Sequence, residues 1–587
     1  MTQYDLIIRR GVVVDGTGAP RRVADVGVKD GRIAAIGELD PGAAAREIDA
    51  DGLIVAPGVI DTHTHYDAQI NWDPYCTTSS WHGMTTAVIG NCGFGYAPVK
   101  PEMRVRYMQM MANTEQIPYP AQAAGLSWGW ETFPDWMEHL RRLPKGVNVL
   151  TYLPVNPLLS YVVGPDEAKR RPPTQAERAR MRELLHEAMD AGAIGFSFSY
   201  LGVEGNSHVD FDQSPMPTDV MDPEEAFNLC KVIRERGGGM IQLLSEMPAM
   251  KNAQEKRAFV EQLAIRSGGR VINNVIVPIS GRPDYHRDSL RWLAGCRERG
   301  LDIWMQSFIG RGWSEFNIMD MNAWDCVPVF RTMSQASTSA ERLALVRSQA
   351  YRDRLRSEYD PERLYEALGP LELHYLVRAG AAKRFAPYVG RELGPLAQEL
   401  DVPVTDLFLD ILSESELEAE LGIVTMVAHD ADWKVEIASD PKVLLGSSDG
   451  GAHGKFNNVA YWSTDYIMQL VRETGLMSLE QVHNLLSARP AEAFELENRG
   501  TLEPGKAADM MIYDYERLNY EFGRYQVLHD LPNGEWRRSV GARGVRYTLV
   551  NGEVTFEDGE CTGATSGSVL MPSVGRRPKK AVLAAAE

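Results

Sequence analysis

Residues 57–67 read PGVIDTHTHYD, and this stretch decides the predicted fold. An apolar run over 53–55 and 59–60 predicts a buried strand that ends in His63-Thr64-His65. Because alternate residues of a strand point to the same side, the two imidazoles leave one face together at the strand's C-terminal end. Two neutral imidazoles on a rigid edge are half of a zinc site, although an isolated His-x-His pair is more often polar surface.

The composition is that of an ordinary globular protein, and 587 residues favour two or three domains. A formal net charge of −19 argues against a nucleic-acid-binding surface. The six cysteines have no paired spacing, which indicates free thiols in a reducing compartment. The first residues, MTQYDLIIRR, do not form a secretory signal, and no apolar run approaches the ~18 residues of a membrane helix. We therefore expect a cytoplasmic protein that does not enter a membrane.

Both ends of the chain carry short apolar runs separated by turn signals. Asp15-Gly16 and Asp51-Gly52 separate such runs near the start, and Asn551-Gly552 is a strong hairpin signal near the end. Neither end is large enough to bury a core by itself. We predict that residues 1–56 and 500–564 pair into one small β-sandwich, and that 565–587 form a mobile tail.

Between the two ends, apolar strands alternate with amphipathic helices. The helix over 174–191 is the clearest, because Thr174 and Glu177 form a capping box before an apolar stripe. The alternation predicts an α/β protein with a (β/α)8 barrel over 57–499, interrupted by a helical insertion at about 340–420 that shapes or covers the mouth. After the first strand, the predicted barrel strands are 84–90, 147–153, 193–200, 240–244, 271–279, 301–308, 422–428 and 443–446.

Active residues of such a barrel lie at the C-terminal ends of its strands. Those ends carry His63 and His65, then Cys92 within GNCG, and finally Asp449 within SSDGG. Two imidazoles, a thiolate and a carboxylate form a credible zinc set. A free cysteine is also a common packing residue, so the position of Cys92 directly after a strand is what favours ligation.

The sequence resembles the amidohydrolase superfamily and, within it, the D-aminoacylase (N-acyl-D-amino-acid deacylase) group. The matching stretches, in chain order, are DLIIRRGVVVDGTG, PGVIDTHTHYD, GMTTAVIGNCGFG, SSDGGAH, LEPGKAADMMIYD and LVNGEV. The resemblance implies that His63, His65, Cys92 and Asp449 bind metal. We expect one ion rather than two, Zn²⁺ or another divalent metal. The resemblance also implies that Asp449 moves a proton between the attacking water and the leaving amine.

The sequence departs from this group at two strand ends, where the group has histidines. The fifth strand, over 239–246, and the sixth, over 275–282, contain none. Gln242 or Glu246 is a candidate oxygen ligand or a polar rim residue. The lysine that the group places after the sixth-strand histidine is also missing, and Arg282 is either its substitute or a solvated loop residue.

Further candidates for substrate binding follow from their places on the predicted barrel. Ser199 and Tyr200 close the fourth strand and either point into the site or fill the barrel. His429 ends a predicted strand, and His453 follows Asp449 in a glycine-rich loop. Each of these histidines either binds substrate, supplements the metal site or is a hydrogen-bonded loop residue.

The sequence thus predicts a metal-dependent hydrolase of a linear amide C–N bond in a small molecule, such as an N-acyl amino acid. A homo-oligomer is compatible with the acidic surface. One alternative is a cyclic-amide hydrolase of the same fold. The other is a barrel whose metal site has decayed and which acts as a binding protein, an alternative motivated by the two missing histidines.

Overall fold

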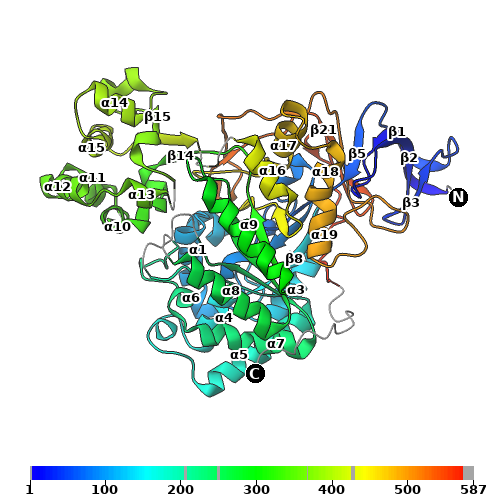
Figure 1. Cartoon of the computed structure of the whole chain (residues 1–587), viewed down its shortest axis with the longest axis horizontal. Helices are drawn as coiled ribbons and strands as arrows, with labels where there is room; N and C mark the ends of the chain where they lie inside the picture. Colours follow the sequence, from blue (N-terminus) through cyan, green and yellow to red (C-terminus); the bar gives the residue numbers. More distant parts are fainter. Residues whose placement is uncertain are drawn as a thin grey trace.

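The computed structural model describes residues 3–203, 208–246, 252–336, 338–365, 368–424, 427 and 430–572. Three parts are visible in Figure 1. A barrel of strands and helices lies in the middle, the N-terminal strands form a sheet at one end, and an insertion forms a lobe at the opposite end. The barrel positions the candidate site, and the other two parts pack onto it.

The barrel consists of parallel strands in the described part of the chain. The third strand is interrupted at Tyr152, and hydrogen bonds connect it to both neighbouring strands at this point. Tyr152 N donates to Ile89 O (3.2 Å), and Ile194 N donates to Thr151 O (3.0 Å). Thr62 N donates to Gly446 O (3.2 Å), which joins the last strand to the first. In order around this ring the strands are β6 (Val59–Asp61), β7 (Met84–Ile89), β8 (Asn148–Thr151) with β9 (Leu153–Pro154), β10 (Gly195–Ser199), β11 (Met240–Leu244), β12 (Arg270–Ile276), β13 (Ile303–Ser307) and β17 (Val443–Leu445).

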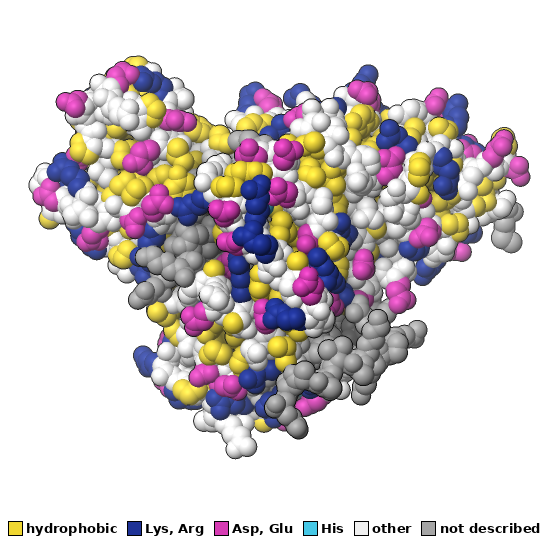
Figure 2. Space-filling view, in the orientation of Figure 1, with side chains coloured by type: hydrophobic (Ala, Val, Ile, Leu, Met, Phe, Trp, Pro, Cys, Tyr) yellow, Lys and Arg dark blue, Asp and Glu magenta, His cyan; other side chains and the backbone are white. Residues whose placement is uncertain are grey.

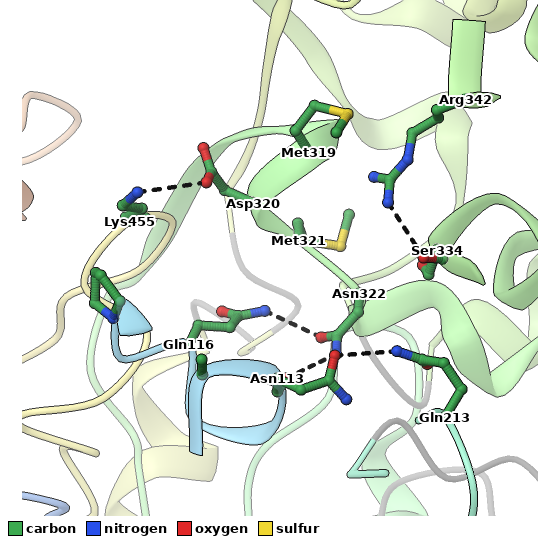
Figure 3. A pocket seen from close by; sticks show the side chains of 12 residues that line it. Asn113, Gln116, Gln213, Met319, Asp320, Met321, Asn322, Ser334, Arg342 and Lys455 are labelled. Atoms are coloured by element: carbon green, nitrogen blue, oxygen red, sulfur yellow. Dashed lines mark hydrogen bonds and ion pairs between the residues drawn. The ribbon is translucent and has the colours of Figure 1, made fainter. Parts of the chain in front are cut away.

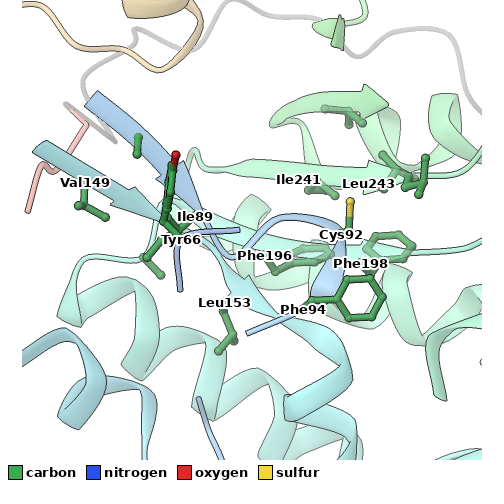
Figure 4. Packing of buried hydrophobic residues seen from close by; sticks show 14 of the residues in the cluster. Tyr66, Ile89, Cys92, Phe94, Val149, Leu153, Phe196, Phe198, Ile241 and Leu243 are labelled. Atoms are coloured by element: carbon green, nitrogen blue, oxygen red, sulfur yellow. The ribbon is translucent and has the colours of Figure 1, made fainter. Parts of the chain in front are cut away.

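Helices cover the outside of the barrel and bury apolar side chains against it. The predicted capping box is present at α5, where Thr174 Oγ1 accepts from Glu177 N. Figure 4 shows part of the core beneath the strands, in which Cys92 lies near Phe196 and Phe198. The principal helices here are α1 (Arg104–Thr114), α2 (Tyr119–Gly125), α3 (Phe133–Arg142), α4 (Val155–Val162), α5 (Gln175–Ala191), α6 (Pro217–Val220), α7 (Pro223–Arg236), α8 (Ala253–Ser267), α9 (Pro283–Glu298), α16 (Ala431–Ser439), α17 (Trp462–Tyr466), α18 (Leu479–His483) and α19 (Arg489–Ala493).

The two ends of the chain pair into one sheet, as the sequence predicts. The link is the antiparallel pairing of β5 with β18. The apolar run before the histidines is therefore divided at Gly58: residues 54–57 belong to this sheet, and the barrel strand starts at 59. The sheet contains β1 (Tyr4–Val13), β2 (Arg22–Lys29), β3 (Arg32–Gly37), β4 (Ala44–Asp49), β5 (Ile54–Pro57), β18 (Met510–Tyr513), β21 (Val545–Val550), β22 (Glu553–Glu557) and β23 (Glu560–Cys561).

A buried ion pair fastens this sheet to the barrel. Asp509 accepts from Arg499 Nη1, from Asn148 Nδ2 (3.1 Å) and from Asn551 N (2.7 Å), and both charged side chains are almost fully buried. We expect Asp509→Ala to lower the free energy of unfolding, measured by urea titration, by about 3–5 kcal/mol, because it leaves the Arg499 charge buried and unpaired. The matched control is Arg142→Ala, which removes an exposed pair with Glu138 and should cost less than about 1 kcal/mol. Equal losses in both variants would contradict the prediction.

The insertion is larger than the predicted helical segment. It begins at β14 (Trp313–Asn317), which pairs antiparallel with β16 (Glu420–Val424), and β16 pairs with β15 (Tyr375–Arg378). The prediction of a barrel strand over 422–428 is wrong for 422–424, because these residues belong to β16, whose partners are antiparallel and lie outside the barrel. Residues 425, 426 and 428 lie outside the described residues. The insertion has its own core and contains α10 (Pro328–Gln335), α11 (Ser339–Arg347), α12 (Gln349–Glu358), α13 (Pro361–Leu364), α14 (Leu393–Glu399) and α15 (Val404–Glu414).

The segment predicted to start a mobile tail is instead attached to the barrel. Gly567 N donates to Lys145 O (2.8 Å), and Val149 exchanges hydrogen bonds with Ser568 O (2.9 Å) and Leu570 N (2.8 Å). Leu570 is buried in a small apolar cluster. The prediction is wrong for these residues because an apolar side chain and a free strand edge hold them, and 573–587 lie outside the described residues.

The surface carries charges of both signs. Figure 2 shows Lys and Arg side chains interspersed with Asp and Glu on the visible face. Within the described ranges, no helix combines the length and the apolar character that crossing a bilayer requires.

Candidate metal centre

The two histidines of the opening motif lie directly after β6, at the C-terminal end of the barrel. Thr64 N donates to Val88 O (3.1 Å) of the neighbouring strand, and His65 N donates to Gly450 O (2.7 Å). His63 and His65 are 1% and 2% exposed. Their backbone is thus held on both sides, which fixes the direction of the two rings.

Cys92 and Asp449 reach the same point from other strand ends. Cys92 Sγ lies 3.3 Å from His63 Nε2, and Asp449 Oδ1 lies 3.4 Å from His63 Nε2 and 3.7 Å from His65 Nε2. Ligand atoms of His63, His65 and Cys92 all lie within 4.8 Å of one another. Both Cys92 (φ 55°) and Asp449 (φ 49°) have left-handed backbone conformations, which are uncommon outside glycine and which concentrate at functional sites.

Hydrogen bonds decide which nitrogen of His63 faces this cluster. Gln306 Nε2 donates to Thr62 O (2.7 Å), so Gln306 Oε1 is the free acceptor for His63 Nδ1 (2.9 Å). Nδ1 therefore carries the proton, and the lone pair of Nε2 points toward Cys92 and Asp449. Nδ1 of His65 has no hydrogen-bond partner among the described residues, and Glu115 Oε1 lies 3.7 Å from it.

The donor set fits a divalent cation electrostatically. Burial raises the pKa of the Cys92 thiol and of the Glu115 carboxyl well above their ordinary values, and burial lowers the pKa of His65 well below its own. Each shift reflects the cost of placing a charge in an apolar interior. A bound dication would offset that cost for the thiolate and the carboxylates. The neutral imidazole has a free lone pair and can bind the same ion as a ligand.

A close approach between two loops requires glycine beside the centre. Gly451 has φ +95°, and a Cβ there would lie 2.6 Å from His65 O. We expect Gly451→Ala to displace the Asp449 loop from the histidines, to cost about 1–3 kcal/mol of stability and to lower the bound metal per chain. Elemental analysis and thermal unfolding measure the two effects. The control Gly295→Ala, inside α9 with open space at the Cβ position, should keep the metal content and should not lose stability, since alanine favours a helix over glycine. Retention of full metal content by Gly451→Ala would contradict the prediction.

The centre opens into a cavity of about 290 Å³ at the mouth of the barrel. Asp449 faces it with 42% of its side chain exposed. One part of the wall is apolar, with Leu244, Val275 and Phe308 among its residues, and another part carries the carboxamides of Asn274, Asn322 and Asn457. No lysine or arginine contributes to this wall among the residues that the structure describes.

The structure brings only some of the other predicted residues to the cavity. His453 lines it, with Nε2 3.5 Å from Glu115 Oε2. Gln242 lies behind the centre, where its Oε1 accepts from Cys92 N (2.7 Å). Ser199 and Tyr200 do not line the cavity: Ser199 is fully buried in β10, and the ring of Tyr200 packs against Phe259.

Two charged candidates are engaged elsewhere. Arg282 forms an ion pair with Glu362 of the insertion, and Glu246 is paired with Arg257 (2.7 Å). These partners explain why neither side chain faces the cluster. His429 lies outside the described residues.

Three residues that the sequence did not single out belong to the cavity wall: Glu115, His208 and Asn274. Asn274 had a detectable signal, because two adjacent asparagines interrupt the apolar strand β12. Glu115 and His208 had none, since each lies in an irregular connection whose path follows from tertiary packing.

The fold and the centre together define a class. A barrel of parallel strands with two histidines, a cysteine and an aspartate converging at the C-terminal strand ends is the architecture of a metal-dependent hydrolase. A model described as amidohydrolase family matches residues 46–261 and 427–556, more than half of the chain. The chain belongs to the amidohydrolase family. The insertion lies within the stretch between the two matched regions.

Known relatives extend over nearly the whole chain. The N-acyl-D-aspartate deacylase of Alcaligenes xylosoxydans xylosoxydans is 28% identical over 97% of this chain and 95% of its own length. A D-aminoacylase structure described as having a binuclear metal centre has a TM-score of 0.64 and 23% identity, over 97% of this chain and all of its own. The N-acyl-D-glutamate deacylase of Bordetella bronchiseptica, complexed with zinc and a phosphonate inhibitor, has a TM-score of 0.63 and 23% identity, over 97% and 99%. The predicted family, its D-aminoacylase group, the fold and the amide-hydrolase class are confirmed.

Proposed function

We propose that this protein hydrolyses an N-acyl amino acid or a related linear amide with one divalent ion, Zn²⁺, held by His63, His65, Cys92 and Asp449. The observation that carries the proposal is the convergence of these four side chains, within 3.3–3.7 Å of a neighbour, at the base of a cavity. An ion in that position would supply Lewis-acid polarisation of the amide carbonyl and would acidify water.

A network of carboxamides supports one ion rather than two. The strands that carry histidines in related enzymes carry Gln242 on β11 and Asn274 on β12 here. Gln242 Nε2 lies 3.4 Å from Gln306 Oε1, and Asn274 Nδ2 lies 3.4 Å from His63 Nδ1. Neutral amides in these positions orient the ligands but offer a second cation only weak oxygen donors.

The solvent exposure of each side chain indicates its role in the proposed reaction. Asp449 is the open carboxylate, so this group takes the proton of the attacking water and returns it to the leaving amine. His63 and His65 are closed off from solvent and keep their orientation throughout. The apolar wall formed by Leu244, Val275 and Phe308 receives the hydrocarbon part of the substrate and excludes water.

A cyclic-amide hydrolase and a metal-free binding protein are the competing functions. The experiment is a panel of N-acyl-D- and N-acyl-L-amino acids and cyclic amides, assayed for amine release and ring opening before and after metal removal and zinc addition. The proposal predicts metal-dependent amine release. Ring opening alone would favour the cyclic-amide hydrolase, and protein that binds neither zinc nor manganese would favour the binding protein. The cytoplasmic location and the possible homo-oligomer stay predictions.

A further inference from the structure

We propose a second binding pocket next to the metal centre, which receives an uncharged amide group at the far end of an elongated substrate. This inference rests on the proposed function, because it assigns the substrate of the same site. The pocket has a volume of about 180 Å³ and lies where the insertion meets the loops of the barrel. Figure 3 shows its side chains arriving from both parts. A ligand bound here would contact the barrel and the insertion together.

The pocket and the catalytic cavity share part of their walls. Gln116 and Asn322 line both spaces, and Gln116 Nε2 donates to Asn322 Oδ1 (3.0 Å). Gln116 Oε1 in turn lies 3.3 Å from Nδ1 of His453, which faces the metal centre. A substrate that extends past the Gln116–Asn322 pair therefore leaves the catalytic cavity and enters the outer pocket.

The outer pocket is suited to hydrogen bonding rather than to charge recognition. Its two cations already have partners: Lys455 lies 3.6 Å from Asp320 Oδ1 and 3.1 Å from Glu535 Oε2. Arg342 donates to the main-chain oxygens of Ile318, Ser334 and Ala336. An additional anion would have to compete with these contacts.

Carboxamide side chains supply the remaining polar wall. Gln213 Nε2 donates to Asn113 Oδ1 (3.1 Å), and Asn322 Nδ2 donates to Asn113 O (2.8 Å). Gln213 Oε1 is buried and accepts no hydrogen bond from any residue that the structure describes. This oxygen has almost no exposed surface, so a rotation of the Gln213 side chain would have to present it to an amide N–H of the substrate. The amide carbonyl of the substrate would then face the donors of the neighbouring carboxamides.

The test compares pairs of substrates of equal length in which the distal group is either a propyl group or an N-methylamide. One such pair carries a hexanoyl or a 4-(methylamino)-4-oxobutanoyl group on the same amino acid. Parallel series vary the length of the acyl chain or place the same distal groups on the amino-acid side of the amide bond. For at least one length we expect the amide-terminated compound to have a KM about 3–10-fold lower, the effect of one or two hydrogen bonds. Gln213→Ala should abolish this preference without changing kcat/KM for the N-acetyl compound. The control Gln398→Ala, exposed on α14, should keep it.

A binding measurement separates this proposal from the proposed function. Calorimetry on zinc-loaded Asp449→Asn protein gives the Kd of each compound without turnover. The pocket is supported if the amide-terminated compounds bind more tightly and this difference is lost when Gln213→Ala is added. A failure to hydrolyse any compound of the panel would count only against the proposed function. Equal KM and Kd for both members of every pair would overturn the pocket while hydrolysis of the short substrate stands.

Discussion

Asp449→Asn is expected to lower kcat for amide hydrolysis by about 10²–10⁴-fold while the purified protein keeps its metal. The asparagine preserves the size of the side chain and one oxygen that faces the histidines, but it cannot accept the proton of water. The carboxylate is partly exposed to the cavity, so it is the group of the cluster best placed to exchange protons with substrate. Steady-state kinetics and elemental analysis on the same preparation give both quantities.

The control for this variant is Asp432→Asn, an exposed carboxylate in the first turn of α16. It changes the net charge equally and should leave kcat unchanged. If Asp449→Asn loses metal as well as activity, the side chain acts chiefly as a ligand. If it keeps more than about a tenth of the wild-type kcat, Asp449 is not the general base.

Cys92→Ala is expected to weaken zinc binding by more than about 10–100-fold. That range is the typical loss of metal affinity when a hydrogen bond to a metal ligand is removed. The thiol lies 3.3 Å from His63 Nε2, and among the described residues only His63, His65 and Cys92 form a metal-binding group within 4.8 Å. Because the proposed ligand set has only four members, each carries a large share of the affinity. Competition with a chelator of known affinity measures the change, and His63→Ala should have a comparable effect.

The matched control is Cys230→Ala, a buried cysteine on α7 that packs in the barrel core. It removes the same atoms and should keep full zinc content, although it loses some packing energy. Zinc retention by Cys92→Ala with unchanged affinity would remove the thiol from the proposed ligand set. The remaining histidines and Asp449 would then have to account for the ion.

The sequence was most informative where local chemistry decides the structure. The capping box at Thr174 and the hairpin at Asn551-Gly552 depend on neighbouring residues, and both occur where predicted. The His63-Thr64-His65 strand end and Asp449 could be placed because a barrel brings all its C-terminal strand ends to one side. The convergence of four predicted side chains follows from that one rule.

The sequence was less informative where partners distant in the chain decide the structure. The run at 422–428 suggested a barrel strand, but its first residues belong to β16, whose antiparallel partners lie at 313–317 and 375–378. Glu115 reaches the centre because the end of α1 packs beside the Asp449 loop, where His453 N donates to Glu115 O (2.7 Å). Nothing near Glu115 in the chain announces that contact.

The sheet built from both ends of the chain has a consequence for synthesis on the ribosome. Strand β5 finds its partner β18 more than 450 residues later, and β21 follows later still. The first strands therefore leave the ribosome with an unpaired edge and wait while the entire barrel and the insertion are made. Pairing over so long a separation is intrinsically slow, so docking of the last strands is expected to be a late step in folding. A chain that stops before residue 510 would keep every candidate metal ligand and still lack the strands that complete its first domain.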